Sequence, residues 1–352
     1  MVIAKLTEQQ GSANRLLPRA ARIHDLIIVG AGPAGLAAAI SARQADLDFR
    51  TFEKGVLVNS LFHFPPQMVF FTTPDLLEIG GLPFVTPHGK PTRDETLRYY
   101  RRVVDTCGLD IDFGYSVTAI RRGADDVFTV RTTHDAHGAE TWRARAVVVA
   151  TGCYDHPNQL GVPGEDLPHV SHYYTEPHEF YRRPVVVVGG KNSAAEAALD
   201  LYRSGAHVTL VHRRAELGGS IKYWVKPDIE NRIREGSIAA RFETRVVEIR
   251  PREVVVESTG GRETLPAEGV LLLTGYLADL DFLRGTGIEV ASNNVPRHDP
   301  ETFETNVPGL YLAGAVVAGA NRGEVFIENG RFHGRVVVEH IARRLGREPV
   351  GA

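Results

Sequence analysis

The sequence predicts an α/β protein that contains two dinucleotide-binding βαβ units, and three observations support this fold class. A hydrophobic strand at 26–29 runs directly into a glycine-rich turn at 30–35, and Glu53 follows where a second strand would end. Another hydrophobic strand at 185–188 runs into a glycine-rich turn at 189–194, and a basic tripeptide follows at the same spacing. The last third contains a further strand and a helix that complete the first domain, which is therefore expected to be discontinuous.

The first turn has the residue pattern of a nucleotide cradle. Its glycines, Gly30, Gly32 and Gly35, let the backbone turn tightly and approach a pyrophosphate, and the following helix offers N–H groups at its positive end. Glu53 can accept hydrogen bonds from both hydroxyls of an adenosine ribose, but it would repel a 2′-phosphate. The first unit is therefore predicted to bind FAD or NAD.

The second turn is similar, but the charge that follows it is opposite. Lys191 occupies the position of the middle glycine, and Arg213 and Arg214 stand near the position of the acid. Two guanidinium groups can clamp a 2′-phosphate in a fork, so this unit is predicted to bind NADP. The residues predicted to hold it are Gly189, Gly190, Lys191, Asn192, Ser193, His212, Arg213 and Arg214.

The composition is that of an ordinary globular protein. The 352 residues are 43% hydrophobic with a net charge of −3, which gives no basic face for nucleic acid, and no apolar run approaches the length of a membrane span. The only cysteines, Cys107 and Cys153, exclude a disulfide scaffold and favour a reducing, cytoplasmic compartment. No metal is expected, because no ligand set has suitable spacing. Residues 1–24 are predicted to be an N-terminal extension.

Between the two units the sequence predicts a long loop, a helix and a β-meander. Residues 58–91 are rich in Phe, Pro and Gly, and they either pack under the sheet or at a subunit contact, or form a wall of a pocket. Thr92 and Glu95 form a capping box that begins a helix. The meander strands are expected near 116–121, 127–132 and 142–149.

The second half begins with a Gly- and Pro-punctuated segment, 161–166, which is expected to cross between domains. The second βαβ unit, at 183–214, is followed by a helical stretch near 228–234 and by a buried strand near 270–275. The final helix is expected over 328–344.

Five motifs carry a resemblance to a known family. They are the first glycine turn with Glu53, Ala150-Thr151-Gly152, Gly161-Val162-Pro163-Gly164-Glu165, the second glycine turn with its basic tripeptide, and Leu312-Ala313-Gly314. Over residues 25–345 the chain resembles the flavoproteins with two dinucleotide-binding domains, such as low-molecular-weight thioredoxin reductase. Three stretches are most similar to the bacillithiol-disulfide reductase (YpdA-type) branch: 52–71 with 76–80, 221–233 and 326–333.

The resemblance implies two Rossmann-like, three-layer (ββα) domains in a homodimer. An FAD domain would comprise 25–158 and 277–352, and an inserted NADPH domain 159–276. Hydride would pass from NADPH to FAD and on to an acceptor, with the NADPH domain rotating about hinges near 152–163 and Gly275. Gly275 also joins the implied NADPH site. The implied FAD-binding residues are Gly30, Gly32, Ala34, Gly35, Glu53, Lys54, Ala150, Thr151, Gly152, Gly314, Ala315, Phe326 and Ile327.

The chain departs from this pattern at positions that matter for chemistry. Tyr173 and Glu176 stand where thioredoxin reductases have a redox Cys-x-x-Cys, so thioredoxin is not the expected substrate. Ala34 stands where the bacillithiol branch commonly has a cysteine, and Ala315 replaces the acid that usually holds the ribityl chain. Cys153, next to Gly152, is the candidate for a redox thiol.

Three hypotheses remain for the electron acceptor. The branch resemblance favours a low-molecular-weight disulfide such as bacillithiol disulfide. The missing dithiol favours a small electron-carrier protein, as in a thioredoxin-reductase-like ferredoxin or flavodoxin NADP reductase. The third hypothesis is a flavoprotein redox sensor with little turnover.

Overall fold

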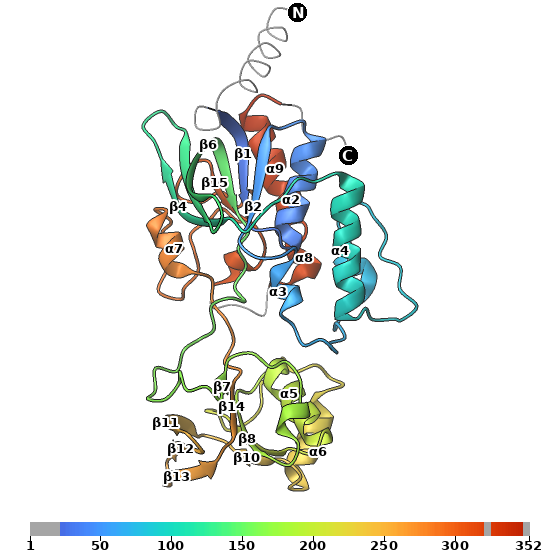
Figure 1. Cartoon of the computed structure of the whole chain (residues 1–352), viewed down its shortest axis with the longest axis vertical. Helices are drawn as coiled ribbons and strands as arrows, with labels where there is room; N and C mark the ends of the chain where they lie inside the picture. The colour runs from blue at the N-terminus through green and yellow to red at the C-terminus, as the bar shows by residue number, and fades with distance from the viewer. Residues whose placement is uncertain (1–21, 320–324, 348–352) are drawn as a thin grey trace, which may run out of the picture. The chain divides into compact units, whose positions relative to one another are not determined.

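The computed structural model describes residues 22–319 and 325–347, which divide into two compact units (Figure 1). Among the described residues, the first unit contains 22–62, 68–156, 277–319 and 325–347, whereas the second contains 63–67 and 157–276. The second unit is thus inserted into the first. None of the described helices carries an apolar stretch long enough to cross a bilayer.

The first unit is built on a sheet in which a parallel half and an antiparallel half share one long strand. The strand order is β3-β2-β1-β6-β5-β4, and β15 also pairs with β6. The end of β6 runs parallel to β1 and β15, whereas its beginning pairs antiparallel with β5 as part of the predicted meander. The strands are β1 (Ile23–Val29), β2 (Phe49–Glu53), β3 (Asp112–Phe113), β4 (Ser116–Arg122), β5 (Phe128–His134), β6 (Gly138–Val149) and β15 (Leu310–Leu312).

The N-terminal extension predicted for 1–24 lies mostly outside the described residues, which begin at 22. Its end belongs to the sheet, because β1 starts at Ile23 and pairs with Arg143 of β6.

Helices cover one face of this sheet, and α2 packs lengthwise against α9 (Figure 1). The predicted capping box is confirmed: the Thr92 hydroxyl accepts from Glu95 N, and Glu95 Oε2 accepts from Thr92 N. The helices of this unit are α2 (Pro33–Gln44), α3 (Asn59–Phe62), α4 (Arg93–Cys107), α7 (Leu280–Gly285), α8 (Ile327–Gly330) and α9 (His333–Arg344), with 3-10 turns η2 (Pro74–Leu77) and η4 (Gly314–Ala318).

The single final helix predicted over 328–344 is wrong, because the chain forms two helices that are separated at Arg331 and Phe332. Arg331 Nη1 donates to the carbonyl oxygens of Asp75 and Glu78, at 2.7 Å each, and these contacts hold the chain in the bend. The residue before the bend, Gly330, has low helix propensity. A partner so distant in sequence could not be read from local periodicity.

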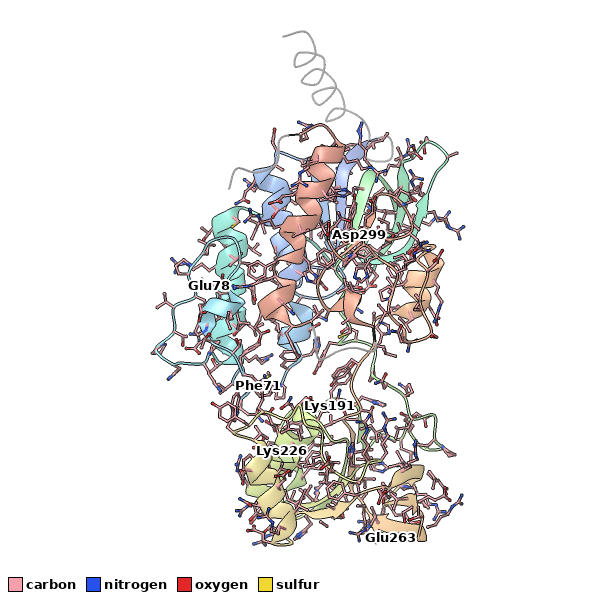
Figure 2. The ribbon with its side chains drawn as sticks, turned by 180° about the vertical axis from the view of Figure 1, so that it is seen from behind. Phe71, Glu78, Lys191, Lys226, Glu263 and Asp299 are labelled. Atoms are coloured by element: carbon pink, nitrogen blue, oxygen red, sulfur yellow. The ribbon has the colours of Figure 1, made fainter. Side chains whose placement is uncertain are left out.

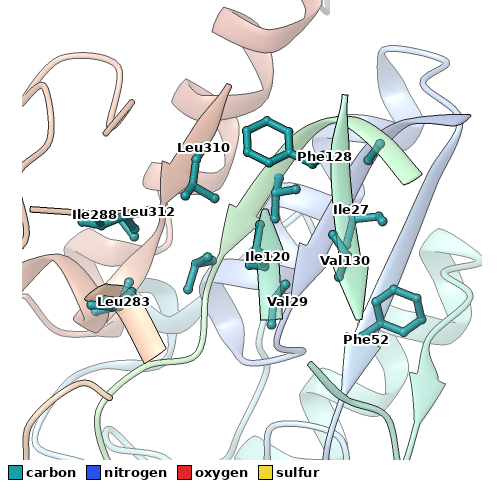
Figure 3. Packing of buried hydrophobic residues seen from close by; sticks show 14 of the residues in the cluster. Ile27, Val29, Phe52, Ile120, Phe128, Val130, Leu283, Ile288, Leu310 and Leu312 are labelled. Atoms are coloured by element: carbon teal, nitrogen blue, oxygen red, sulfur yellow. The ribbon is translucent and has the colours of Figure 1, made fainter. Parts of the chain in front are cut away.

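The core of the first unit lies between the parallel strands and the meander (Figure 3). Ile27, Val29 and Phe52 meet Ile120 and Phe128 there, and all five are at most 5% exposed. This packing fixes the ends of β1 and β2, from which the first glycine turn and Glu53 project.

The second unit has a parallel five-stranded sheet in the order β10-β9-β8-β14-β7, with a helical layer on one face and an antiparallel meander on the other. This is the predicted three-layer arrangement. Its elements are β7 (Val170–Ser171), η3 (His178–Phe180), β8 (Pro184–Val188), α5 (Asn192–Arg203), β9 (His207–Val211), α6 (Lys226–Arg234), β10 (Ala239–Arg241), β11 (Arg245–Arg250), β12 (Glu253–Ser258), β13 (Gly261–Pro266) and β14 (Gly269–Leu272).

Candidate functional site

The first glycine turn is tightly packed at two of its glycines. Gly30 has φ +104°, and a Cβ on it would lie 2.6 Å from Ala150 O. A Cβ on Gly35 would lie 2.0 Å from Gly30 O. Any side chain at these two positions would therefore push the strand, the turn and α2 apart.

The middle glycine of the turn has a different role. A Cβ on Gly32 would meet nothing within 4 Å, so the space beside its backbone is open. Gly32 is also the N-cap of α2, has extended geometry and makes no side-chain capping bond. An open backbone at the positive end of a helix fits a pyrophosphate group.

Glu53 ends β2 with its side chain buried and directed into this turn. Glu53 Oε2 accepts from Ala31 N at 2.8 Å, and Oε1 accepts from Gly55 N at 2.9 Å. A carboxylate oxygen has two acceptor sites, so each still has one to offer a ribose hydroxyl. The neighbouring Lys54 forms an ion pair with Asp155, Nζ to Oδ2 at 2.8 Å.

The predicted Ala150-Thr151-Gly152 stretch directly follows β6, beside the first turn. Ala150 N donates to Val29 O at 2.8 Å, and Gly152 turns the chain with φ +68°. Cys153 follows in a half-buried position, and neither it nor Cys107 is joined in a disulfide. Burial raises the pKa of the Cys107 thiol.

The carboxyl end of β15 brings a distant part of the sequence to the same turn. Gly314 has φ +79°, and a Cβ on it would lie 2.7 Å from the Cβ of Ala34. Ala315 follows in η4. Phe326, which precedes α8, is 55% exposed, and its N–H donates to Asn329 Oδ1 at 2.8 Å. The amide of Phe326, an implied FAD-binding residue, is therefore already satisfied within its own turn.

The second glycine turn is closed by a histidine ring. Gly189 has φ +157°, and a Cβ on it would lie 2.7 Å from Leu273 O. A Cβ on Gly190 would lie 2.2 to 2.5 Å from the ring atoms of His212, so the imidazole covers this glycine. Burial, then the charges of Arg214 and Arg213, lower the pKa of His212, so the ring is neutral at physiological pH.

Three cations border this turn. Lys191, at the N-terminus of α5 (Figure 2), and Arg213 and Arg214, which follow β9, are all exposed residues. None of the three forms an ion pair with any carboxylate in the described ranges. Unpaired guanidinium groups beside a helix N-terminus fit a second dinucleotide that carries a 2′-phosphate. Ser193, another residue of the predicted NADP-binding set, is also exposed.

A loop that the sequence reasoning did not include completes the second turn. Gly218 N donates to Gly190 O at 2.8 Å. Asn192 holds the same loop on two sides: its Oδ1 accepts from Lys222 N at 2.9 Å, and its Nδ2 donates to Ser220 O at 3.1 Å. The pair of glycines at 218–219 was the available signal for this loop.

Gly275 lies where the chain returns from the second unit. Its carbonyl accepts from Asn158 N at 2.8 Å, and Asn158 also exchanges two hydrogen bonds with Thr274. Tyr173, at the position of the missing cysteine, stacks on Tyr276 with ring centroids 5.6 Å apart. Both segments of the predicted hinge are therefore paired with each other by hydrogen bonds.

Two glycine-rich turns, one in a discontinuous unit and one in the unit inserted into it, are followed by side chains of opposite charge. This arrangement is typical of an oxidoreductase that uses two dinucleotides. The chain belongs to the pyridine nucleotide-disulphide oxidoreductase family, whose model matches residues 27–314. This membership confirms the predicted fold class, the oxidoreductase activity and the cofactors FAD and NADPH.

Individual relatives within and near this family show which proteins the chain is similar to. Bacilliredoxin reductase Bdr from Bacillus subtilis (strain 168) is 42% identical over 321 residues, which are 90% of this chain and 97% of the relative. The solved bacillithiol disulfide reductase Bdr (YpdA) from Bacillus cereus matches with a TM-score of 0.89 and 39% identity, covering 91% of this chain and 99% of that one. A ferredoxin–NADP reductase from Ignicoccus hospitalis is 25% identical over 91% of this chain and 98% of the relative.

Proposed function

We propose that this protein is an NADPH-dependent flavoprotein reductase whose acceptor is a low-molecular-weight disulfide, bacillithiol disulfide. The observation that carries the proposal is the likeness to the two Bdr proteins over nearly the whole length of all three chains. The name of the solved relative gives bacillithiol disulfide as its substrate, and that of the other relative gives bacilliredoxin.

In this proposal the first unit is the FAD domain and the second is the NADPH domain. Gly30 and Gly35 allow the turn to pack closely, Gly32 leaves space for the FAD pyrophosphate, and Glu53 binds the ribose through its remaining acceptor sites. FAD, when bound, supplies two-electron chemistry by accepting a hydride from a nicotinamide ring. The remaining proposed FAD contacts are Ala34, Lys54, Ala150, Thr151, Gly152, Gly314, Ala315, Phe326 and Ile327.

In the second unit, the residues of the chain bind and select the nucleotide. Arg213, Arg214 and Lys191 place positive charge where a 2′-phosphate would lie, which favours NADPH over NADH. Gly189, Gly190, Asn192 and Ser193 present the turn, His212 closes it, and Gly275 borders the site in this proposal.

The reaction balances without a dithiol in the protein. NADPH and one proton reduce one disulfide to two thiols, so two electrons and two protons are accounted for. The two cysteines of the chain are not in a Cys-x-x-Cys arrangement. We therefore expect Cys153→Ser to retain turnover.

An acceptor comparison tests the proposal. Purified holoprotein is mixed with NADPH and with bacillithiol disulfide, a ferredoxin, a flavodoxin or no acceptor, and NADPH oxidation and free thiol are measured. We expect two thiols for each NADPH with bacillithiol disulfide, in wild type and in Cys153→Ser. Reduction of a ferredoxin or flavodoxin without thiol release would instead support the carrier-protein reductase that the Ignicoccus likeness favours. Flavin reduction with no turnover of any acceptor would support the redox-sensor hypothesis.

The assembly and location of the protein remain predictions. We expect a homodimer, because the resemblance to the two-domain flavoproteins implies one. We expect a cytoplasmic location, because the cysteine usage favours a reducing compartment. Sedimentation of the holoprotein measures the subunit number directly.

A further inference from the structure

The backbone at Gly314 lies where three helices of the first unit meet. The Cβ of Ala34, in the first turn of α2, lies 2.7 Å from where a Gly314 Cβ would stand. Gly330, at the end of α8, is also close, because a Cβ on it would lie 3.3 Å from Gly314 Cα. His333 begins α9, and its Nδ1 accepts a hydrogen bond from Gly314 N at 3.2 Å.

The α9 end that carries His333 is fixed against the nucleotide turn. A Cβ on Gly334 would lie 2.3 Å from Ala38 N and 2.8 Å from Ala34 O, so this glycine lets α9 press directly on the start of α2. A shift of His333 would therefore also move the helix whose N-terminus borders the proposed FAD pyrophosphate site.

The ring of Phe303 packs against the imidazole of His333. Phe303 stacks on His333 with ring centroids 4.1 Å apart and planes at 21°. Phe303 has φ +58°, a left-handed conformation that is unusual for a bulky residue and is retained only where the surroundings impose it. His298 also stacks on Phe303, more loosely, with ring centroids 6.0 Å apart.

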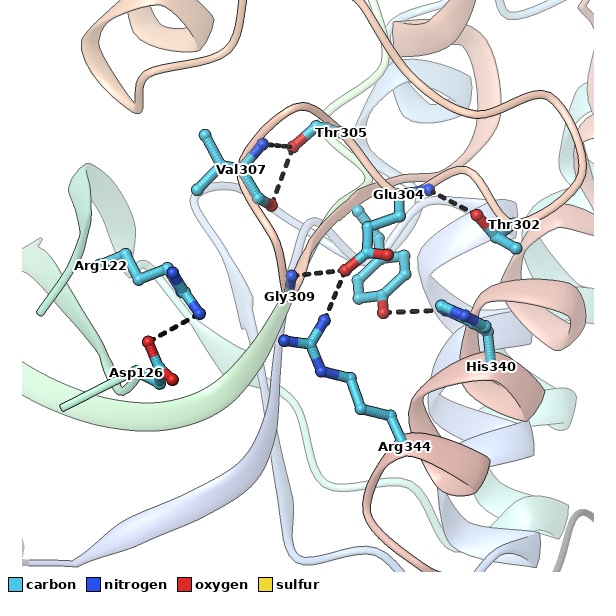
Figure 4. A network of polar contacts seen from close by, with 10 residues as sticks. Arg122, Asp126, Thr302, Glu304, Thr305, Val307, Gly309, His340 and Arg344 are labelled. Atoms are coloured by element: carbon cyan, nitrogen blue, oxygen red, sulfur yellow. Dashed lines mark hydrogen bonds and ion pairs between the residues drawn. The ribbon is translucent and has the colours of Figure 1, made fainter. Parts of the chain in front are cut away.

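The segment that presents Phe303 is itself anchored (Figure 4). Glu304 Oε1 accepts from Gly309 N at 2.7 Å and from Arg344 Nη1 of α9 at 2.6 Å. Tyr311 of β15 also contacts α9, with its hydroxyl 3.0 Å from His340 Nδ1. The strained Phe303 is therefore fixed to the same helix and strand that bear His333 and Gly314.

We propose that His333 is a positioning residue of the flavin site, which holds the Gly314 turn in its left-handed conformation by accepting the Gly314 amide hydrogen bond. The Nδ1 atom must be unprotonated to accept, so the ring acts as the neutral Nε2–H tautomer. Burial, with a smaller contribution from the charge of His298, lowers the pKa of His333 to about 4 and keeps the ring neutral.

This inference rests on the proposal that the first cradle holds FAD. Without an acceptor at position 333, the Gly314 N–H loses its partner and the turn gains freedom that FAD binding must then remove. The result expected is weaker FAD binding and an altered flavin spectrum, not a general loss of fold.

Two variants separate the hydrogen bond from the ring. His333→Phe keeps a ring that can stack on Phe303 but removes the acceptor, whereas His333→Asn keeps an acceptor near the Nδ1 position and removes the stack. Phe332→Leu, at the exposed neighbouring position, is the matched control. The Kd for FAD of each apoprotein, its melting temperature and the visible spectrum of the bound flavin are measured.

We expect His333→Phe to weaken FAD binding about tenfold and to shift the flavin bands, and His333→Asn and Phe332→Leu to stay within about threefold of wild type. Equal binding and an equal spectrum in His333→Phe would overturn the inference, and so would an equal loss in His333→Asn. If His333→Phe does not fold, His333→Leu, which also lacks a hydrogen-bond acceptor, takes its place under the same criterion. A wild-type protein that binds no FAD would instead overturn the proposed function.

Discussion

At the scale of single residues, the two cradles differ chiefly in the side chains that follow β2 and β9. Glu53 is buried and already accepts two backbone hydrogen bonds, whereas Arg213 and Arg214 are exposed and have no carboxylate partner among the described residues. The acid is part of the folded turn, and the arginines are available for a ligand. This contrast is the physical basis for assigning different nucleotides to the two units.

The arginine pair gives the first prediction. Arg213→Ala with Arg214→Ala should lower the ratio of kcat/KM for NADPH to that for NADH by about 10- to 100-fold, because charge-assisted hydrogen bonds to the 2′-phosphate are lost. Steady-state kinetics with both nucleotides measures this ratio. Arg245→Ala, at an exposed position of β11, is the control and should leave the ratio unchanged. An unchanged ratio in the double variant would remove the arginines from nucleotide selection.

His333 gives a prediction about pH. Its folded-state pKa of about 4 is below its ordinary value of 6.5, so the folded state disfavours its protonation. The stability this contributes is present above pH 6.5 and is lost as the pH falls from 6.5 toward 4. Between these limits the free energy of unfolding of wild type should fall more steeply than that of His333→Asn, in urea denaturation of the apoprotein. Parallel pH profiles would show that His333 is not held neutral by the fold.

At the scale of elements, the glycine turns show that one motif serves two purposes. Gly30 and Gly35 are required by packing, because a Cβ at either would contact backbone oxygen at 2.6 or 2.0 Å. A Cβ on Gly32 would meet no atom within 4 Å, so the space beside this glycine is open. Sequence alone could not separate these roles, since all three belong to one pattern.

A matched pair of substitutions tests this division. Gly35→Ala should lower the melting temperature of the apoprotein by several degrees, because its methyl group would collide with Gly30 O. Gly32→Ala should leave the apoprotein melting temperature nearly unchanged and weaken FAD binding about tenfold or more, because the methyl group would occupy the proposed pyrophosphate space. Thermal unfolding and FAD titration make the comparison. Normal FAD affinity in Gly32→Ala would place the pyrophosphate elsewhere.

How much of each element could be predicted depended on whether its determinants were local. The two βαβ units, the meander and the Thr92 cap follow from hydrophobic periodicity and short motifs, which act within a few residues of one another. The break between α8 and α9 depends on Arg331 reaching carbonyl groups near residues 75–78, and no local pattern records that contact.

The same distinction applies to the candidate site. The spacing in the sequence identifies the glycines, Glu53 and the arginines. The loop held by Asn192 and the His333–Gly314 contact form only when distant segments fold together. The resemblance to a family placed Gly314 at the first cradle, but it did not identify the side chain that supports it.

At the scale of the whole molecule, paired chain segments link two units, each of which binds one dinucleotide in our proposal. Asn158, near the start of the second unit, forms three hydrogen bonds with residues 274–275, near its end. In the proposed function, electrons pass from NADPH to FAD, and we propose that the side chains beside the two glycine turns select which nucleotide binds to each unit.

The measurement that tests this central claim most directly is an anaerobic titration of the purified protein, followed by its visible flavin absorbance. We predict one FAD per chain, full loss of the oxidised flavin absorbance on adding one equivalent of NADPH, and much slower loss with NADH. A protein that binds no flavin after FAD supplementation, or whose flavin is reduced equally fast by both nucleotides, would contradict the account.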